Sequence, residues 1–114
     1  MDRQHKVWGE RWLLRVDDMH AVSFLKVEPG FKCSWHRHKT KYNLFAVLKG
    51  ALTIKTEELE GVLKETILGK GECFTVRPGQ FHEFYAKEYT EVIEEMYVSY
   101  QDADIERIVL GGKL

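Results

Sequence analysis

Residues 30–50 read GFKCSWHRHKTKYNLFAVLKG, a stretch that begins and ends with glycine and carries two histidines near its middle. His36 and His38 stand two positions apart on a segment that we expect to be extended. Because side chains alternate between the two sides of an extended chain, both imidazoles are expected to face the same side. Asn43 follows five positions after His38, inside an apolar run that Gly50 ends. The stretch therefore predicts a polar pair followed by a buried strand.

A third histidine stands further along the chain, just after a turn. Pro78-Gly79 is a strong turn signal, and His82 lies in the strand expected to follow it. Imidazole is a common ligand of transition metals. Three ring nitrogens can hold one side of an ion and leave other positions open for water or substrate. The sequence therefore predicts a divalent metal (zinc, nickel, iron or manganese) on His36, His38 and His82.

Short runs rich in β-branched and aromatic residues alternate with turn signals along most of the chain. Strands are expected over Trp12–Val16, Ala21–Val27, Tyr42–Leu48, Ala51–Thr56, Glu65–Leu68, Cys73–Val76, Phe81–Tyr85 and Thr90–Tyr100. Glu57–Lys64 is expected to be a charged connection, and Asp102–Leu110 a short helix near the carboxyl end. Many short strands without intervening helices favour an all-β barrel or sandwich. In the absence of a linker, residues 1–114 are expected to form one domain.

Charge and composition restrict the classes of partner. The 114 residues include 17 basic and 18 acidic side chains, a net charge of -1, so no nucleic-acid partner is expected. No apolar run is long enough for a transmembrane helix, and the first residues are too polar for a signal peptide, so no membrane association is expected. Cys33 and Cys73 lack CxxC spacing, which favours a cytoplasmic protein with reduced thiols.

The spacing of these residues resembles the two sequence motifs of the cupin family. The first motif is matched by Gly30, His36, His38, Asn43 and Gly50, and the second by Gly71, Pro78-Gly79 and His82. The resemblance implies a double-stranded β-helix, or jelly-roll barrel, with one metal-binding pocket. Three positions depart from the family pattern. Asn43 replaces a glutamate ligand, Arg77 a proline and Ala86 an asparagine.

Asn43 is the departure that most affects a metal. Its amide oxygen can coordinate the ion without adding negative charge, its side chain can orient a histidine, or it can simply line the pocket. We include Asn43 among the predicted metal ligands with these alternatives open. A site of three histidines and a neutral fourth group favours borderline metals such as zinc, nickel or iron.

The flanking segments resemble a narrower group, the cupin domain of type II mannose-6-phosphate isomerases. Val7–Trp12, Val27–Gly30 and Asp102–Arg107 are similar to segments of that family. Family members often carry glutamine at the first histidine position and a basic residue two positions before the glutamate ligand; here these positions hold His36 and Lys41. The resemblance implies a metal-dependent isomerase that acts on a sugar or sugar phosphate.

Three functions are compatible with these residues, and each has a small molecule as the partner. In an isomerase or a related enzyme, the metal polarises a substrate oxygen while Lys41 or Glu94, the predicted catalytic residues, moves a proton. A non-catalytic module binds a small sugar in the same pocket. An iron dioxygenase is the third alternative, because three-histidine cupin sites also carry out oxygen chemistry.

Other residues are assigned to packing. The expected core and pocket wall comprise Phe45, Val47, Leu52, Ile54, Phe74, Phe84 and Met96. By strand parity, Cys33 is expected to point away from His36 and to make no metal bond. Cys73 is expected to be buried as a small apolar residue.

The amino-terminal segment carries two tryptophans, Trp8 and Trp12, which we expect to pack inside the protein or to contact another subunit. Short barrels leave sheet edges that need cover. The sequence therefore predicts a homodimer in which Val7–Leu14 reaches across to the second copy.

Overall fold

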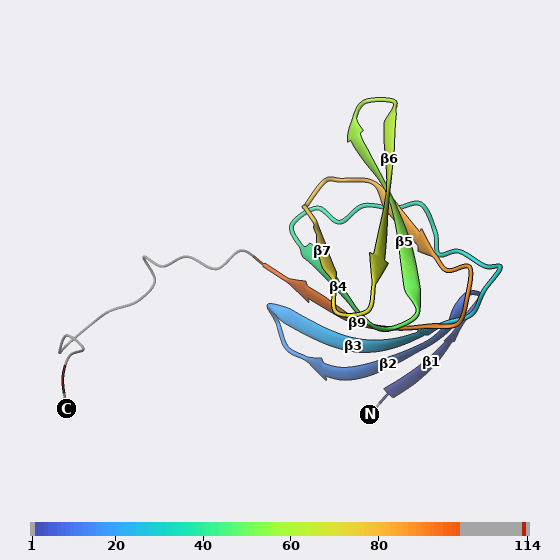
Figure 1. Cartoon of the computed structure of the whole chain (residues 1–114). Helices are drawn as coiled ribbons and strands as arrows, with labels where there is room; N and C mark the ends of the chain where they lie inside the picture. The colour runs from blue at the N-terminus through green and yellow to red at the C-terminus, as the bar shows by residue number, and fades with distance from the viewer. Residues whose placement is uncertain (1, 99–112, 114) are drawn as a thin grey trace.

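The chain folds into two antiparallel β-sheets, shown in Figure 1. The computed structural model describes residues 2–98 and residue 113. The larger sheet has the strand order β1 (Asp2–Lys6), β2 (Gly9–Val16), β3 (His20–Val27), β9 (Thr90–Tyr97), β4 (Tyr42–Lys49), β7 (Cys73–Val76). The smaller sheet has the order β6 (Val62–Gly69), β5 (Ala51–Leu59), β8 (His82–Tyr85). The predicted all-β cupin architecture is confirmed, and residues 2–98 contain no helix.

The core forms where the inner faces of the two sheets meet. Along β4 the buried positions alternate with more exposed ones, so that Phe45 and Val47 point inward. Leu52 and Ile54 on β5 meet them from the other sheet and are fully buried. Burial of each such side chain contributes about 1.5–3 kcal/mol to stability. The period-two pattern of the sequence therefore predicted these four core residues correctly.

A tight turn at Gly50 carries the chain from the larger sheet to the smaller one. Gly50 has a φ of 83°, and a Cβ atom there would lie 2.6 Å from the Thr90 hydroxyl oxygen. That hydroxyl donates to the carbonyl of Ala51 and accepts from its N–H. Glycine is required here because β4 and β5 pass close to the start of β9.

The amino-terminal hairpin extends the larger sheet beyond the predicted strands. β1 pairs with β2, and β2 begins at Gly9, not at Trp12. The backbone of Gly9 passes so close to β3 that a Cβ atom would overlap the carbonyl oxygen of Lys26. The N–H of Glu28 donates to the Trp8 carbonyl at 2.8 Å, which ties the turn of the hairpin to the end of β3. The hairpin is thus fixed by backbone contacts, which the side-chain pattern of the sequence does not reveal.

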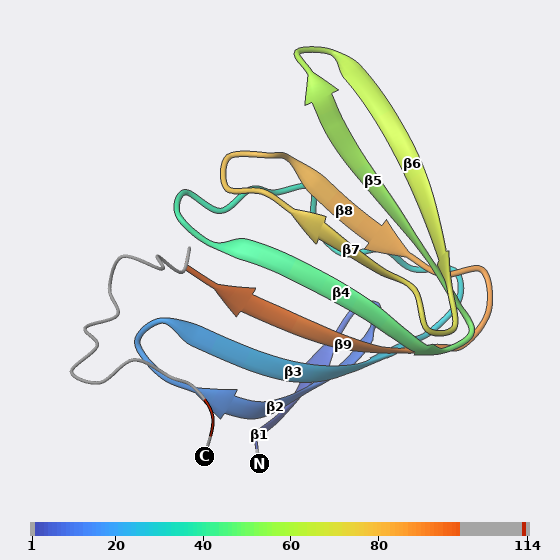
Figure 2. The same ribbon diagram turned by 60° about the vertical axis from the view of Figure 1, so that its left-hand side comes forward.

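Two local predictions were wrong. The expected connection Glu57–Lys64 is paired as strand almost throughout, with β5 reaching Leu59 and β6 beginning at Val62. The end of this hairpin extends away from the rest of the fold (Figure 2), so its side chains are exposed. Charged residues are compatible with strand pairing there, and the charge of the segment therefore does not indicate a loop. Cys73, expected to be buried, is exposed on the edge strand β7.

The carboxyl-terminal helix expected over Asp102–Leu110 lies outside the described residues, as does the end of the strand expected to reach Tyr100. Among the residues that the structure describes, no helix is long and apolar enough to cross a membrane.

Candidate metal centre

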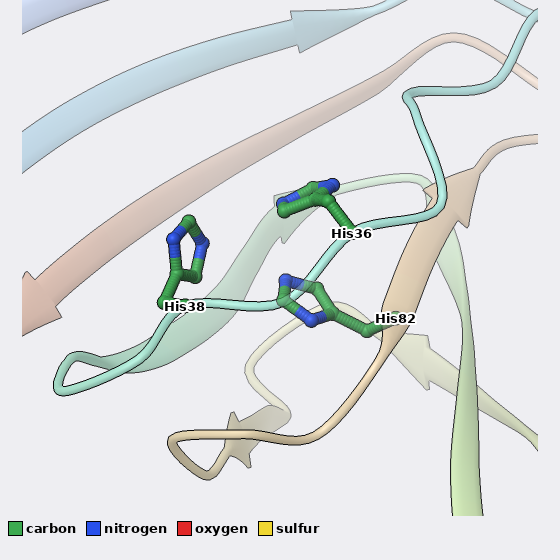
Figure 3. Close-up of side chains that lie close together, drawn as sticks. All are labelled: His36, His38 and His82. Atoms are coloured by element: carbon green, nitrogen blue, oxygen red, sulfur yellow. The ribbon is translucent and has the colours of Figure 1, made fainter.

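Three histidines meet beside the smaller sheet, as Figure 3 shows. His36 and His38 lie in the connection between β3 and β4, and His82 is the first residue of β8. Two backbone hydrogen bonds join His36 to His82, at 3.1 and 2.8 Å, and the His38 carbonyl accepts from the N–H of Gly79 at 2.7 Å. Each histidine offers one ring nitrogen to a group whose members all lie within 4.8 Å of one another. The predicted trio is therefore brought together by backbone pairing.

Two of the rings are held in a defined tautomer. Nδ1 of His36 lies 2.7 Å from the carbonyl oxygen of Ser34, and Nδ1 of His82 lies 2.9 Å from that of Gln80. Because a carbonyl oxygen can only accept a hydrogen bond, each Nδ1 carries the proton. The Nε2 lone pairs of both rings are consequently free to bind a metal, an arrangement common to metal-ligating histidines.

Several buried polar atoms at the site lack a hydrogen-bond partner among the described residues. They are Nε2 of His38, Nε2 of His82 and the amide oxygen Oδ1 of Asn43. A buried polar atom without a partner costs about 1–3 kcal/mol, so such atoms indicate a missing partner. A divalent metal held by the histidine nitrogens would satisfy two of them. The residues present therefore fit the metal that the sequence predicts.

The surroundings keep two of the histidines neutral, which metal binding requires. Burial, helped by the charges of His36 and His38, lowers the pKa of His82 to about 4, although its hydrogen bond to Gln80 acts in the opposite direction. The pKa of His38 is also lowered, first by burial and then by the charges of His36 and Lys41. Both rings are therefore unprotonated near pH 7.

Asn43 and Glu94 form a buried pair next to the histidines. Asn43 is 2% exposed on β4 and donates from Nδ2 to a carboxylate oxygen of Glu94 on β9 at 3.4 Å. Burial raises the pKa of Glu94, while the positive charge of Arg11 and the hydrogen bond from Asn43 lower it. Asn43 thus orients a carboxyl group. Its role as a metal ligand stays a prediction.

A cavity of about 330 Å³ opens beside the histidines. Its wall comprises Lys6, Val7, Trp8, Arg11, Cys33, Ser34, His36, His38, Phe84, Glu94 and Met96. His82 is 1% exposed and lies buried next to the other two histidines. The predicted residues Glu94, Phe84 and Met96 therefore line one cavity together with His36 and His38.

Three other residues that the sequence singled out differ in their position relative to the cavity. The predicted catalytic residue Lys41 is exposed and forms no part of the cavity wall. Arg77, one of the three positions that depart from the cupin motif, lies in a separate groove beside the Pro78 turn. Cys33 lines the cavity despite its parity, because the chain around it forms isolated bridges and no regular strand. Its sulfur accepts the N–H of Phe84 at 3.1 Å, and it is not a member of the histidine group.

Sequence reasoning missed two cationic residues of the cavity wall, Lys6 and Arg11. Both lie on the amino-terminal hairpin. The signal that would have found them is the pairing register, since Arg11 lies opposite Gln4 and Lys6 is two residues further along the same strand. Without knowledge of β1, that register cannot be derived.

Comparison with known proteins supports the architecture. The cupin domain family model matches residues 23–94. KdgF from Halomonas sp. superposes with a TM-score of 0.73 at 19% identity, over 90% of this chain and 93% of that one. The Cnp3 cupin domain of Schizosaccharomyces pombe gives 0.72 at 14% identity, over 87% and 69%. A single-residue variant of Bacillus subtilis oxalate decarboxylase gives 0.74 at 15% identity, over 94% of this chain and 30% of that one.

Identities this low establish a shared fold and nothing finer. No curated protein matches the chain in sequence. None of these findings supports the narrower resemblance to type II mannose-6-phosphate isomerases. The family match covers more than half of the chain and includes all three histidines. With its two-sheet fold and its histidine group, the chain belongs to the cupin family.

Proposed function

We propose that this protein is a metal-dependent enzyme that isomerises a small, oxygen-rich metabolite of the sugar or sugar-phosphate kind. A divalent metal is held by His36, His38 and His82, and Glu94 transfers the proton. The observation that carries the proposal is a group of three histidine nitrogens close together beside a cavity whose wall also contains one buried carboxyl group. Cavities of small-molecule enzymes begin at about this volume.

The bound metal supplies Lewis-acid polarisation of a substrate carbonyl or hydroxyl oxygen. The remaining chemistry falls to the residues of the chain. Glu94 is the one carboxyl group among the described residues of the cavity wall, and the amide of Asn43 holds one of its oxygens. An isomerisation needs a single group that removes a proton from one carbon and returns it to the next. One oriented carboxyl group matches this requirement.

The surroundings of Glu94 support this assignment over the alternative base. Lys41 is exposed and lies outside the cavity wall, whereas Glu94 is 9% exposed on the central strand β9. Apolar side chains, Phe84 and Met96, line part of the same cavity. A buried carboxyl group at such a wall is suited to accept a proton from a substrate carbon and to return it.

Metal binding is tested first. Wild-type protein incubated with zinc, nickel, iron or manganese is expected to retain about one ion per chain by elemental analysis. His38→Ala is expected to lower the affinity about 100-fold or more, because one of three ligands is lost. His20→Ala, on β3 and paired with Glu95, is the matched control and is expected to keep the metal. A wild-type protein without bound metal after such loading contradicts the proposal.

Proton transfer is tested separately on the metal-loaded protein. Aldoses, ketoses and their phosphates are incubated in heavy water, and isomerisation and deuterium incorporation are followed by NMR. Glu94→Gln is expected to abolish turnover and to retain the metal. Glu95→Gln, the neighbour on β9 that pairs with His20, is expected to remain active. Binding without turnover would instead establish a binding module, and oxygen consumption by the iron form would establish a dioxygenase.

A further inference from the structure

The cavity wall contains two cationic side chains in addition to the histidines. Lys6 on β1 and Arg11 on β2 both line it. Arg11 pairs with Gln4 across the hairpin, and Lys6 is two residues from Gln4, so all three side chains lie on the same face of the sheet. That face is the inner one, because Arg11 lies opposite Leu25, which is fully buried.

The guanidinium of Arg11 is held in place by its neighbour. Its Nε donates to the hydroxyl of Ser23 at 3.0 Å, and Ser23 is 1% exposed. Ser23 in turn lies opposite Glu94 in the pairing of β3 with β9. The two terminal nitrogens of Arg11 have no hydrogen-bond or ion-pair partner within residues 2–98. The terminal N–H groups of Arg11 are therefore held at the cavity wall and remain available to a ligand.

Lys6 adds a second positive charge to the cavity wall. Its ammonium forms no ion pair within the described part of the chain. In the wall, two cationic side chains face a single carboxyl group, Glu94. A metal on the histidines would make the cavity more positive still. Such a field attracts anions and binds them through charge-assisted hydrogen bonds.

The hairpin that carries both cations is rigidly attached. Trp8, in its turn, is 8% exposed and packs edge-on against Phe84 with ring centroids 5.0 Å apart. Because Gly9 has no Cβ atom, the backbone of the hairpin contacts β3 directly. Because the hairpin is fixed before a ligand arrives, little ordering entropy is lost on binding.

We propose that Lys6 and Arg11 bind the anionic group, carboxylate or phosphate, of a small metabolite whose other oxygens face the histidines. The proposal rests on the proposed function and specifies its substrate class as acids or phosphate esters, not neutral sugars. Arginine presents two parallel donors that match either group. Both residues lie outside the segment matched by the cupin family model, residues 23–94, so this selectivity belongs to the hairpin of this chain.

The test is a calorimetric titration of zinc-loaded protein with three probes of similar size: gluconate, glucose 6-phosphate and neutral glucitol. At least one anionic probe is expected to bind about tenfold or more tightly than glucitol. Arg11→Met and Lys6→Met are each expected to remove about tenfold of that preference and to leave glucitol binding unchanged. Arg11→Lys is expected to keep part of the preference for anionic probes. The anionic probe that binds more tightly identifies the preferred group as carboxylate or phosphate.

A matched control is Arg15→Met, on the same strand but exposed and paired with Asp17. It is expected to bind all probes as the wild type does. Thermal melting and zinc content show that each variant is folded and loaded. The proposal is overturned if the wild type shows no preference for anions, or if both Met variants retain it. Since the readout is binding, a Glu94→Gln variant that still isomerises its substrate would contradict the proposed function without affecting this result.

Discussion

At the scale of the residue, the histidine group is ordered before any metal arrives. The carbonyls of Ser34 and Gln80 fix the rings of His36 and His82 through their Nδ1 protons. Ligands that are already oriented lose little side-chain entropy when an ion binds. The same hydrogen bonds also raise the electron density at Nε2, which strengthens the bond to a metal. Backbone carbonyls thus contribute to affinity without touching the ion.

The role of Asn43 can be tested by exchanging it with its partner. Asn43→Glu alone places a second carboxyl group beside Glu94, and repulsion between the two opposes the gain in metal affinity. The double variant Asn43→Glu/Glu94→Gln keeps an amide–carboxyl hydrogen bond and moves the negative charge to position 43. We expect it to bind zinc about tenfold more tightly than Glu94→Gln. Competition with a chromogenic chelator measures the difference.

Equal or weaker affinity in the double variant would remove Asn43 from the metal ligands. The three histidines would then form the whole protein contribution. The single variant Glu94→Gln is the reference because it carries the same loss of charge at position 94.

The two cysteines are expected to differ sharply in reactivity. Cys73 is exposed, whereas Cys33 is 8% exposed and burial raises its pKa to about 11. Only a thiolate attacks a disulfide reagent such as DTNB, so at mildly alkaline pH one thiol per native chain is expected to react quickly and both after unfolding. Cys73→Ser is expected to remove the fast reaction. Rapid modification that persists in Cys73→Ser would contradict the burial of Cys33.

The raised pKa of Cys33 also affects stability at high pH. In the unfolded chain this thiol ionises near pH 9.0, but in the folded chain it stays protonated up to about pH 11. The folded state therefore holds a proton that the unfolded state releases. The stability that depends on this proton is present below pH 9.0 and is lost as the pH rises toward about 11. Cys33→Ala is expected to flatten the dependence of unfolding free energy on pH in that window.

Single residues were predictable from sequence where chemistry and local spacing coincide. His36, His38 and His82 were found because imidazole is distinctive and because the turn at Pro78-Gly79 sets the distance to His82. The position of Lys41, exposed and outside the cavity wall, could not be derived, since it depends on the path of an irregular loop. Arg11 was missed because the strand expected to begin at Trp12 begins at Gly9, which places Arg11 opposite the buried Leu25.

At the scale of the element, the amino-terminal hairpin depends on one glycine. Gly9→Ala would push a methyl group into the Lys26 carbonyl at a φ of 147°, which we expect to destabilise the protein by about 3 kcal/mol. Urea unfolding measures the loss. The metal content is expected to remain unchanged, because the histidines lie on other elements. Anion binding is expected to weaken as the hairpin shifts.

Gly61→Ala provides the matched control. Gly61 also has a positive φ, 77°, but no atom lies within 4 Å of the position that its Cβ would take. The expected loss is about 1 kcal/mol, from backbone strain alone. Equal losses in the two variants would show that the contact with Lys26 does not hold the hairpin.

Elements were predicted well where one face is buried and poorly where neither is. The alternation in β4 and β5 reflects a sheet with one apolar face, so the sequence pattern indicates it. β1 and the outer part of the β5–β6 hairpin carry mostly exposed side chains, and their pairing relies on backbone hydrogen bonds. Such hydrogen bonds do not depend on side-chain type, and this explains why Glu57–Lys64 was read as a connection.

At the scale of the whole molecule, the outer face of the larger sheet is suited to a second copy of the chain. Trp12, Leu14, Phe24 and Ile93 line a shallow apolar groove there, and Leu14 is 46% exposed. β1 also ends the sheet with an unpaired edge among the described strands. We predict a homodimer through this face and the segment Val7–Leu14. Light scattering is expected to give twice the chain mass of 13.4 kDa.

Leu14→Glu is expected to shift this mass toward that of the single chain, because it places a charge in the apolar contact. Leu59→Glu is the control, since Leu59 is also exposed but lies on the β5–β6 hairpin. A wild-type protein that scatters as a single chain at assay concentration would contradict the dimer.

The cavity is assembled from two separate stretches of sequence, and this division has an evolutionary consequence. The histidines lie within the segment shared with other cupins, whereas Lys6 and Arg11 precede it. Sequence changes in the amino-terminal hairpin can therefore alter which molecules bind in the cavity and leave the histidine group intact. A chimaera that carries the hairpin of another cupin is expected to inherit the donor's selectivity while keeping the reaction of the recipient.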